Sequence, residues 1–598
     1  MFETKRPIGV DVDLPQRPPA LVAVASVPGA SKPETGQPLW VDPSIDGPDI
    51  RLVMALGPST CVRLGVLPWQ RCGSVTVVLV DDPNIFHRSS KLLEDTFGQV
   101  RIALCSREKQ REVLVSQFGW QMALDAEDRA PAEYSCRNWS LPRTRRLALT
   151  CLCLLGALCI VLPELLVWIV MAWTGLTLLA STALKAFAIY FARGDSAAKD
   201  VPAAPVPAHL PVVSILVPLF KEREIASHLL ARLERLDYPR EKLDLCLILE
   251  EEDSLTREAL EAASLPSWSQ VITVPSGAVQ TKPRALNYAL NFAHGSMIGI
   301  YDAEDAPAPD QISKVVQRFA ERGPDVACLQ GVLDFYNTSR NWLSLCFTLE
   351  YAAWFRLVLP GLQRMGLVLP LGGTTLFLRR QAIEAVGGWD AHNVTEDAEL
   401  GLRLARNGYR VEMIDTVTCE EANARAWPWV RQRSRWLKGY AMTWAVHNAK
   451  PTVLWRAVGP WRFLGVQVLY LATLSQFVLA PVIWTFWAVP FGLWHPMGAS
   501  VHVGVMWSMA ALFLLTEIVN FAAAFIATRR SGRRWLGLWA PLMHLYFPLA
   551  TIAVYKALWE MVTRPFYWDK TSHGAFHWPA QIGRSPVTPP LRPLKHPV

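Results

Sequence analysis

Met297-Ile298-Gly299-Ile300-Tyr301-Asp302-Ala303-Glu304-Asp305 is the stretch that decides the fold expected for this chain. Its mostly apolar first half has the length of a buried strand, and its second half places three carboxylates directly after that strand. Carboxylates spaced by one residue at a strand end can converge on one divalent cation. Asp302, Glu304 and Asp305 are therefore candidate ligands of Mg²⁺ or Mn²⁺, and a solvated acidic turn before Pro307 is the alternative.

Similar apolar runs on both sides of this stretch predict an α/β domain over residues 210–450. Continuous apolar strands that alternate with helical patterns are typical of a mostly parallel sheet with flanking helices. Ligands of such sheets bind at the carboxyl ends of the strands. The other expected strands and helices are Val212–Val217, Leu245–Glu250, Val271–Val274, Ile225–Leu236 and Arg284–Ala293.

Two further polar clusters follow expected strands of this domain. Glu250 and Asp253 belong to an acidic run that ends one strand, where they could meet the base or ribose of a nucleotide. Lys282 could approach a phosphate group. Each signal is weak alone, and the order of the clusters along one sheet gives them weight.

Thr395-Glu396-Asp397 begins an expected helix over Glu396–Arg406. Thr395 is a candidate N-cap, and Asp397 lies in the first turn, where the helix dipole favours its ionised form. An ionised carboxylate at a site mouth suits a general base that deprotonates an acceptor hydroxyl. The alternative is an ordinary capping acid.

Gln432, Arg435 and Trp436 stand at positions i, i+3 and i+4, so on a helix they share one face. An amide, a guanidinium and an indole on one face form a wall that suits a sugar diphosphate. The alternative is an amphipathic helix at the membrane surface, and both interpretations can hold together.

The composition indicates a protein that is part soluble and part embedded in a membrane. Of 598 residues, 51% are hydrophobic and 19% are charged. The net charge of +7 fits arginines that flank membrane segments and argues against a nucleic-acid partner. The 11 cysteines form no C-x-x-C pair, so neither a zinc site nor a disulfide framework is expected, as at a reducing cytosolic face.

Apolar segments predict two groups of transmembrane helices, at residues 146–192 and 460–563. The first group contains two spans that meet at Pro163, and the second contains two clear spans and one segment broken by Pro541 and Pro548. Flanking arginines predict that the α/β domain over residues 210–450 lies in the cytosol. The tail, 564–598, is external if the last segment spans simply and cytosolic if it turns back at Pro548, which its basic character favours.

Residues 1–48 read as a disordered Pro-rich arm, and residues 49–130 as a small α/β domain. The run from Leu64 through Pro83 resembles part of the N-terminal domain of type II secretion and pilus ATPases. Because some relatives of that domain bind cyclic di-GMP, the resemblance implies cyclic di-GMP or a protein partner there.

Residues 210–450 resemble glycosyltransferase family 2, in its membrane-integrated branch with cellulose, chitin and hyaluronan synthases. The matching residues are Val217-Pro218, Glu222, Glu250, Lys282, Asp302 to Asp305, Thr395 to Asp397 and Gln432 to Trp436. The acidic run at Glu250 and the D-A-E-D order at Asp302 depart from the usual aspartates of the family. With the C-terminal run Pro565–Gly574, these departures resemble a bacterial subgroup that includes phage adsorption protein B-like and exopolysaccharide glycosyltransferases.

The resemblance implies a GT-A-like fold and a role for each matching residue. Asp397 would be the catalytic base, and a Mg²⁺ or Mn²⁺ ion at Asp302 and Glu304 would hold the diphosphate of a UDP-sugar. Glu250 or Asp253 would contact the nucleoside, and Gln432, Arg435 and Trp436 would bind the diphosphate and the acceptor. The acceptor would be bordered by Trp436, Glu396, Gly373 and Thr374. Trp568 to Thr571 resembles the gating loop that covers UDP in polysaccharide synthases, and an interfacial aromatic anchor is the alternative.

These features together predict a multi-pass protein of the bacterial inner membrane that polymerises a sugar from a UDP-sugar by inverting displacement and extrudes an exopolysaccharide. A non-processive transferase that adds one sugar to a membrane lipid carrier is the second interpretation. A catalytically inactive receptor or regulatory scaffold is the third.

Overall fold

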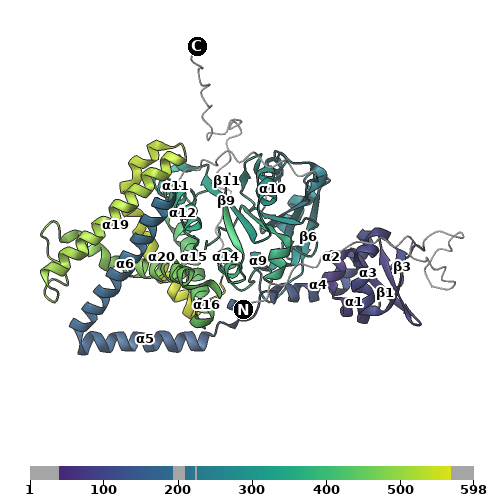
Figure 1. Ribbon diagram of the computed structural model, residues 1–598, viewed down its shortest axis with the longest axis horizontal. Coiled ribbons are helices and arrows are strands. Elements are labelled where there is room, and N and C mark those ends of the chain that lie inside the picture. The colour runs from purple at the N-terminus through teal and green to yellow at the C-terminus, as the bar shows by residue number, and fades with distance from the viewer. Residues whose placement is uncertain (1–38, 193–208, 223–224, 568–598) are drawn as a thin grey trace, which may run out of the picture. The chain divides into compact units, whose positions relative to one another are not determined.

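The computed structural model describes residues 39–192, 209–222 and 225–567. The chain divides into two compact units, Met1–Met122 and Ala123–Val598. Figure 1 shows the elements of each unit. The predicted gating-loop resemblance at Trp568 to Thr571 lies outside the described residues.

The first unit is a three-stranded sheet with helices. The middle strand, β2 (Val75–Val80), pairs antiparallel with β1 (Val66–Cys72) and parallel with β3 (Gln99–Leu104). Backbone hydrogen bonds join Val41 N to Leu104 O and Leu104 N to Leu39 O. The structure thus places residues 39–48 in this α/β unit, whereas the sequence assigned them to the arm. The elements are α1 (Ile50–Leu56), α2 (Pro58–Leu64), β1 (Val66–Cys72), β2 (Val75–Val80), α3 (Pro83–Phe97), β3 (Gln99–Leu104) and the first part of α4 (Arg107–Glu127).

The second unit contains an eight-stranded mixed sheet in the order β6-β5-β4-β7-β10-β9-β11-β8. The first four strands are mutually parallel, as predicted, and so are β9 and β11. Strand β10 is antiparallel to both of its neighbours. The strands are β4 (Val213–Leu219), β5 (Leu243–Glu250), β6 (Ser269–Val274), β7 (Met297–Ile300), β8 (Ala306–Pro307), β9 (Val326–Phe335), β10 (Leu376–Arg379) and β11 (Arg410–Glu420).

The antiparallel strand β10 has a direct effect on the site. Its first residue, Leu376, pairs with Ile300, the last residue of β7. The chain entering β10 therefore lies beside the chain leaving β7, so Thr374 and Asp302 come to the same edge. The sequence predicted β7 and its acidic end but not this partner.

Helices flank the sheet (Figure 1). Buried side chains of α7 (Ile225–Leu233) and α10 (Gln311–Glu321) pack with those of β4 and β5 in one hydrophobic cluster. The remaining helices of this part are α8 (Ser254–Glu261), α9 (Lys282–Ala289), α13 (Arg380–Ala385), α14 (Glu396–Arg406), α15 (Ala426–His447) and α16 (Pro451–Val458). The predicted α/β class with membrane helices is confirmed.

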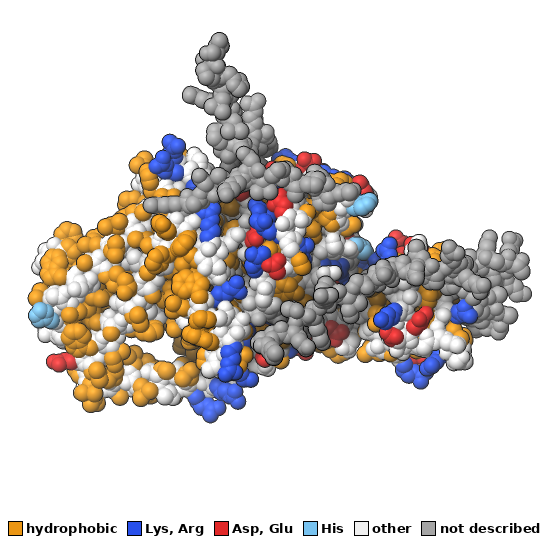
Figure 2. All heavy atoms as spheres, in the orientation of Figure 1, with side chains coloured by type: hydrophobic (Ala, Val, Ile, Leu, Met, Phe, Trp, Pro, Cys, Tyr) orange, Lys and Arg blue, Asp and Glu red, His pale blue; other side chains and the backbone are white. Residues whose placement is uncertain are grey.

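Six helical segments of the described chain are long and apolar enough to cross a membrane. In Figure 2, hydrophobic side chains cover the region of α5, α6 and α19, and Lys and Arg gather where that region meets the sheet. The segments are α5 (Leu141–Val161), α6 (Pro163–Ala192), α11 to α12 (Trp342–Arg364), α17 to η6 (Pro460–Ala488), α19 (Val503–Arg530) and η7 to α20 (Arg534–Thr563).

One of these segments was not predicted. Trp342–Arg364 lies between strands of the catalytic sheet in sequence, and 67% of its apolar window is buried inside the protein. Its mean hydropathy of 1.2 is the lowest of the six, so the sequence pattern does not distinguish it as a membrane-spanning segment.

The last apolar segment does not break at Pro548, because α20 (Met543–Thr563) continues through that residue. The change is at Met543, where the 3₁₀-helix η7 (Arg534–Leu542) becomes α-helical. Both ends of the segment contact the α/β domain, since Arg533 pairs with Asp334 at 2.8 Å and Glu560 pairs with Lys438 at 2.9 Å. The tail therefore starts on the side of the α/β domain.

Candidate active site

A cavity of about 1030 Å³ joins the carboxyl ends of the parallel strands to the transmembrane helices. Its walls come from the end of β5, from the loops after β4, β6 and β7, from the chain entering β10, from the start of α14, and from α15, α6, α18 (Thr473–Thr485) and α19. Most side chains singled out from the sequence line it: Glu250, Lys282, Asp302, Glu304, Gly373, Thr374, Glu396, Asp397, Gln432, Arg435 and Trp436. The two that do not are Asp253 and Asp305.

Asp302 faces the cavity beside a partly buried lysine. Lys282 Nζ lies 2.5 Å from Asp302 Oδ1 and donates to Gly373 O at 2.7 Å. Burial opposes the charge of Lys282, but Asp302 and Glu396 outweigh it and raise the pKa of the lysine. The lysine therefore ties the loop after β7 to the chain entering β10.

Asp305 turns away from the cavity and holds the loop. One of its oxygens accepts hydrogen bonds from Asp302 N at 2.8 Å and from Thr374 Oγ1. Burial, with Asp302 and Glu304 nearby, raises the pKa of Asp305 well above its usual range. Within the described residues no group of three His, Cys, Asp or Glu side chains is arranged to hold a metal ion. Of the predicted ligands, only Asp302 and Glu304 line the cavity.

Asp253 also serves the scaffold instead of facing a nucleotide. It is the N-cap of α8, accepting from Thr256 N at 3.2 Å and from Thr256 Oγ1 at 2.6 Å. Its other contact is Lys221 N at 2.6 Å. The carboxylate thus fixes the loop after β4 to the start of α8.

Glu250, in contrast, reaches the cavity from the end of β5. Its carboxylate lies 3.2 Å from the guanidinium of Arg284, which is fully buried. Burial raises the pKa of Glu250 to about 7, with the neighbouring Glu252 and Glu127 adding to the rise and Arg284 opposing it. The group therefore titrates near neutral pH.

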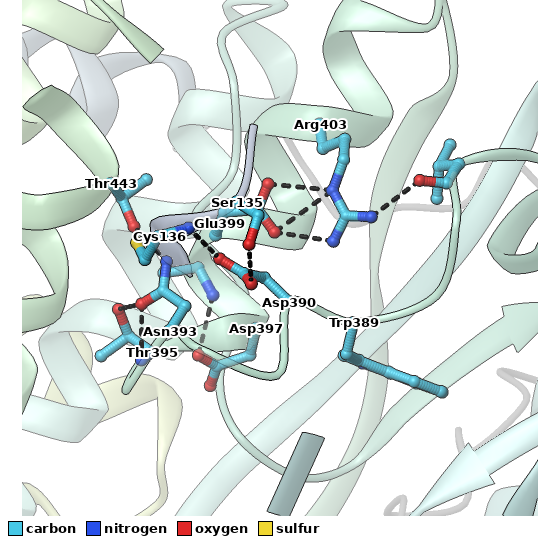
Figure 3. A network of polar contacts seen from close by, with 12 residues as sticks. Ser135, Cys136, Trp389, Asp390, Asn393, Thr395, Asp397, Glu399, Arg403 and Thr443 are labelled. Atoms are coloured by element: carbon cyan, nitrogen blue, oxygen red, sulfur yellow. Dashed lines mark hydrogen bonds and ion pairs between the residues drawn. The ribbon is translucent and has the colours of Figure 1, made fainter. Parts of the chain in front are cut away.

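Asp397 lies in the first turn of α14, as predicted. Its Oδ1 accepts from Ala398 N at 2.8 Å, and a Cβ at Gly373 would come within 3.2 Å of its Oδ2. Thr395 is at the N-cap position but makes no side-chain cap, and Asn393 Oδ1 instead accepts from Thr395 N at 3.0 Å (Figure 3). Burial raises the pKa of Asp397, so the helix start does not dominate as the sequence suggested.

The neighbouring carboxyl groups are also perturbed. Burial and the adjacent Asp397 raise the pKa of Glu396 to about 8. Glu420, at the end of β11, was missed in the sequence. Burial and the carboxylates of Asp305, Glu304 and Asp302 raise its pKa well above the usual range. The signal was the one used at Asp302, acidic residues that end a strand.

Helix α15 carries the third motif. Gln432, Arg435 and Trp436 all line the cavity, as their spacing predicted. Gln432 accepts from Asn423 Nδ2 at 2.8 Å. Arg433, which lies between Gln432 and Arg435 in the sequence, pairs with Glu350 at 2.5 Å. Its guanidinium lies 4.8 Å from the ring centre of Trp436. The pair with Glu350 ties the motif helix to the unpredicted segment Trp342–Arg364.

The membrane half of the cavity contains polar side chains that the sequence reading had treated as parts of plain spans. Thr182 of α6 hydrogen bonds Thr516 of α19 at 2.8 Å, and Lys185 Nζ donates to Asn520 Oδ1 at 2.5 Å. Glu517 of α19 pairs with His544 of α20 at 3.3 Å. Phe566 and Tyr567, at the start of the tail, line the same cavity.

The α/β domain is similar in sequence to known glycosyltransferases. Residues 211–439 match the model of the family described as "Glycosyltransferase like family 2". "Probable glycosyltransferase YdaM" of Bacillus subtilis is 26% identical over 233 residues, which are 38% of this chain and 55% of the relative. "Beta-monoglucosyldiacylglycerol synthase" of Nostoc sp. is 27% identical over 275 residues, covering 45% of this chain and 57% of the relative.

The matched region spans just over half the length of these two relatives. The synthase of the same name from Synechocystis sp. is 25% identical over 428 residues, 68% of this chain and 84% of the relative. Among solved structures, the mannosyltransferase PcManGT from Pyrobaculum calidifontis, in complex with GDP-Man and Mn²⁺, matches with a TM-score of 0.42 and 18% identity, covering 63% of this chain and 98% of that chain.

Proposed function

We propose that this chain, whose residues 211–439 are a glycosyltransferase family 2-like domain, transfers a sugar from a UDP-sugar to an acceptor held between its membrane helices. The observation that carries the proposal is the single cavity that reaches from Asp397 to Lys185 of α6. Its six apolar segments would place the protein in a bacterial inner membrane, with the catalytic domain in the cytosol.

The donor would bind at the strand ends. Glu250 would accept a hydrogen bond from the nucleoside, and Lys282 and Arg435 would neutralise the diphosphate. Gln432 would hold the same group from α15. All four side chains line the cavity.

The excess of negative charge at this edge favours a divalent cation that two carboxylates share with the donor. Carboxylates outnumber the lysine that balances them, and among the described residues a buried oxygen of Glu420, Oε1, has no hydrogen-bond partner. We propose that Asp302 and Glu304 hold Mg²⁺ or Mn²⁺. When bound, the cation would screen the charge of the leaving nucleoside diphosphate.

Asp397 would act as the general base. Its carboxylate, with a free approach over Gly373, would take the proton of the acceptor hydroxyl while that oxygen attacks the anomeric carbon. One displacement inverts the configuration and gives a β-linkage. Trp436 would stack on the acceptor sugar, with Glu396, Gly373 and Thr374 around it.

We favour a processive polymerase that extrudes an exopolysaccharide. Thr182 and Lys185 lie ten and seven residues before the end of α6, so polar wall extends about 10–15 Å into the helices. Hydroxyl and amide groups at this depth suit a saccharide better than an acyl chain. The relatives named for a glycolipid favour the second candidate, a single transfer to a membrane lipid.

Product size separates the candidates. Purified protein in lipid, given a panel of labelled UDP-sugars with Mg²⁺ or Mn²⁺, should form a long polymer from one of them. A lipid-linked monosaccharide would establish the second candidate and rule out the first. No turnover and no binding of UDP would leave an inactive scaffold.

The small unit has a separate proposed ligand. Its resemblance to secretion-ATPase domains implies cyclic di-GMP or a protein partner. Calorimetric titration of cyclic di-GMP into the full chain tests the first of these directly.

A further inference from the structure

Residues 123–138, here called the strap, join the small unit to the first membrane helix and lie against the catalytic domain. The strap begins with the last residues of α4 and ends with the short helix η1 (Cys136–Asn138). It contacts the catalytic domain at three places, each next to a motif of the proposed active site. No site residue was predicted in this segment.

The first contact is at Asp390, which is fully buried. Ser135 Oγ donates to Asp390 Oδ1 at 2.7 Å, and Cys136 N donates to Asp390 Oδ2 at 2.7 Å (Figure 3). Asp390 O in turn accepts from Asn393 N at 3.1 Å, in the loop that leads to Asp397. Both oxygens of this buried carboxylate are thus engaged by the strap.

The second contact is at Asn287 of α9, the helix that Lys282 begins. The buried Asn287 Nδ2 donates to Ala126 O at 2.9 Å, and Arg129 donates to Asn287 O at 3.1 Å. Gly388, with a φ of +67°, makes room for this arrangement, since a Cβ there would lie 2.3 Å from Asn287 Oδ1 and 2.8 Å from Arg129 Cδ.

The third contact reaches the donor end of the cavity. Arg284 of α9 is fully buried between two carboxylates, with Glu127 Oε1 3.0 Å from its Nε and Glu250 Oε2 3.2 Å from its Nη1, and its Nη2 donates to Pro275 O. Gly277 borders this pair, because a Cβ there would lie 2.3 Å from Arg284 and 2.4 Å from Glu127 Oε1. These contacts connect the strap, through Arg284, to Glu250 in the wall of the proposed donor site.

We propose that the strap is part of the donor site's support, and that Glu127 is a positioning residue that acts through Arg284 on Glu250. This inference rests on the proposed function, because it assigns Glu250 to the donor. A guanidinium that is paired with one carboxylate can move together with that carboxylate. A guanidinium between two carboxylates in fixed positions has the orientation of its planar N–H groups set by both. Removing Glu127 would leave Arg284 held by Glu250 and the Pro275 carbonyl alone, so the guanidinium and Glu250 could shift together.

The charge of Glu127 has a second effect, on the ionisation of Glu250. The charged groups that face Glu250 are Arg284, Glu252 and Glu127, and the last two raise its pKa while Arg284 lowers it. A glutamine at position 127 would therefore lower the pKa of Glu250. Since the ionised form accepts hydrogen bonds from the nucleoside, donor affinity would rise with pH over a lower range than in the native protein.

The test compares full-length Glu127→Gln with native protein in lipid, using the UDP-sugar that supports turnover. Above about pH 8, where Glu250 is ionised in both, KM for the donor should rise about tenfold while kcat changes little. The pH at which KM improves should move to lower values. Glu133→Gln, which alters an exposed carboxylate of the strap, is the matched control and should leave both quantities unchanged.

Glu127→Asp separates geometry from charge and also covers the case in which the glutamine variant does not fold. The aspartate keeps the negative charge but places it one methylene farther from Arg284. KM for the donor should therefore rise, while the pH dependence of KM stays as in native protein. Native values of KM and pH dependence in both variants would overturn the inference while leaving the proposed function intact. If the native protein neither binds UDP nor uses any UDP-sugar, the proposed function falls and the assignment of Glu127 falls with it.

Discussion

The two ends of the cavity solve the problem of buried charge in different ways. At the sheet end, Asp302, Glu396 and Asp397 surround one lysine, Lys282, and the pKa of Glu396 is raised to about 8. At the membrane end, Lys185 donates to Asn520, and Glu517 lies 3.3 Å from His544.

The difference teaches what each end requires from a ligand. Crowded carboxylates favour a bound cation, since it relieves their mutual repulsion. Groups that are already paired can only exchange one hydrogen bond for another, which would suit an uncharged acceptor. The sheet end should therefore set the chemistry, and the membrane end the nature of the product.

The largest effect is expected from Asp397→Asn. An amide of the same shape cannot accept the proton of the acceptor hydroxyl, so transfer should fall by about 10²–10⁴-fold. Binding of UDP, measured by calorimetry, should persist because Asp397 does not contact the donor in the proposed arrangement.

Asp415→Asn, at an exposed position on β11, is the control for this variant and should retain native activity. If Asp397→Asn keeps more than a tenth of native turnover, Asp397 is not the base. In that case Glu396 or Glu420 would have to supply this function.

The sequence predicted much of the sheet end and little of the membrane end, for a physical reason. Acidic residues after an apolar strand, as at Asp302, are local signals, because a strand end brings them to the site whatever else surrounds it. The same signal at Glu420 was present and overlooked. Which carboxylate faces the cavity depends on hydrogen bonds from distant residues, as with Thr374 and Asp305.

Contacts between helices leave no such local signal. Lys185 and Asn520 lie in mostly apolar helices more than 300 positions apart, and only packing of α6 on α19 brings them together. The strap was missed similarly, since Glu127 becomes meaningful only once Arg284 is known to lie between it and Glu250.

An intermediate effect is expected from Lys185→Met, which removes a charge from the membrane end but keeps the chain length. Loss of one hydrogen-bonding group along the acceptor path should change polymer length or rate by about three- to tenfold. UDP binding should be unaffected. Gel filtration of the labelled product measures the length, and Leu176→Ala, at an exposed position of α6, is the control.

This variant also tests the division of labour between the two ends. An unchanged size distribution would mean that the acceptor does not pass Lys185. Loss of UDP binding would mean that the two ends are not separable.

The smallest effect concerns stability at the sheet end. Because the folded protein raises the pKa of Glu396 from 4.5 to about 8, the folded state binds the proton more tightly than the unfolded state. Its contribution to stability is fully present below about pH 4.5 and is lost as the pH rises towards 8. In Glu396→Gln this loss is absent. The apparent Tm in detergent with EDTA should therefore fall between pH 5 and pH 8 by about 2–4 °C less in the variant than in native protein.

Divalent cations sharpen the same measurement. A cation held at Asp302 and Glu304 favours ionised neighbours, so Mg²⁺ or Mn²⁺ should flatten the pH dependence of native protein and change that of Glu396→Gln less. Glu258→Gln, at an exposed position of α8, should follow native protein in both conditions. If the Tm of native protein depends on pH in the same way with the cation and with EDTA, the carboxylates at the sheet end do not share a cation. The contrast between the two ends would then rest on Lys282 alone.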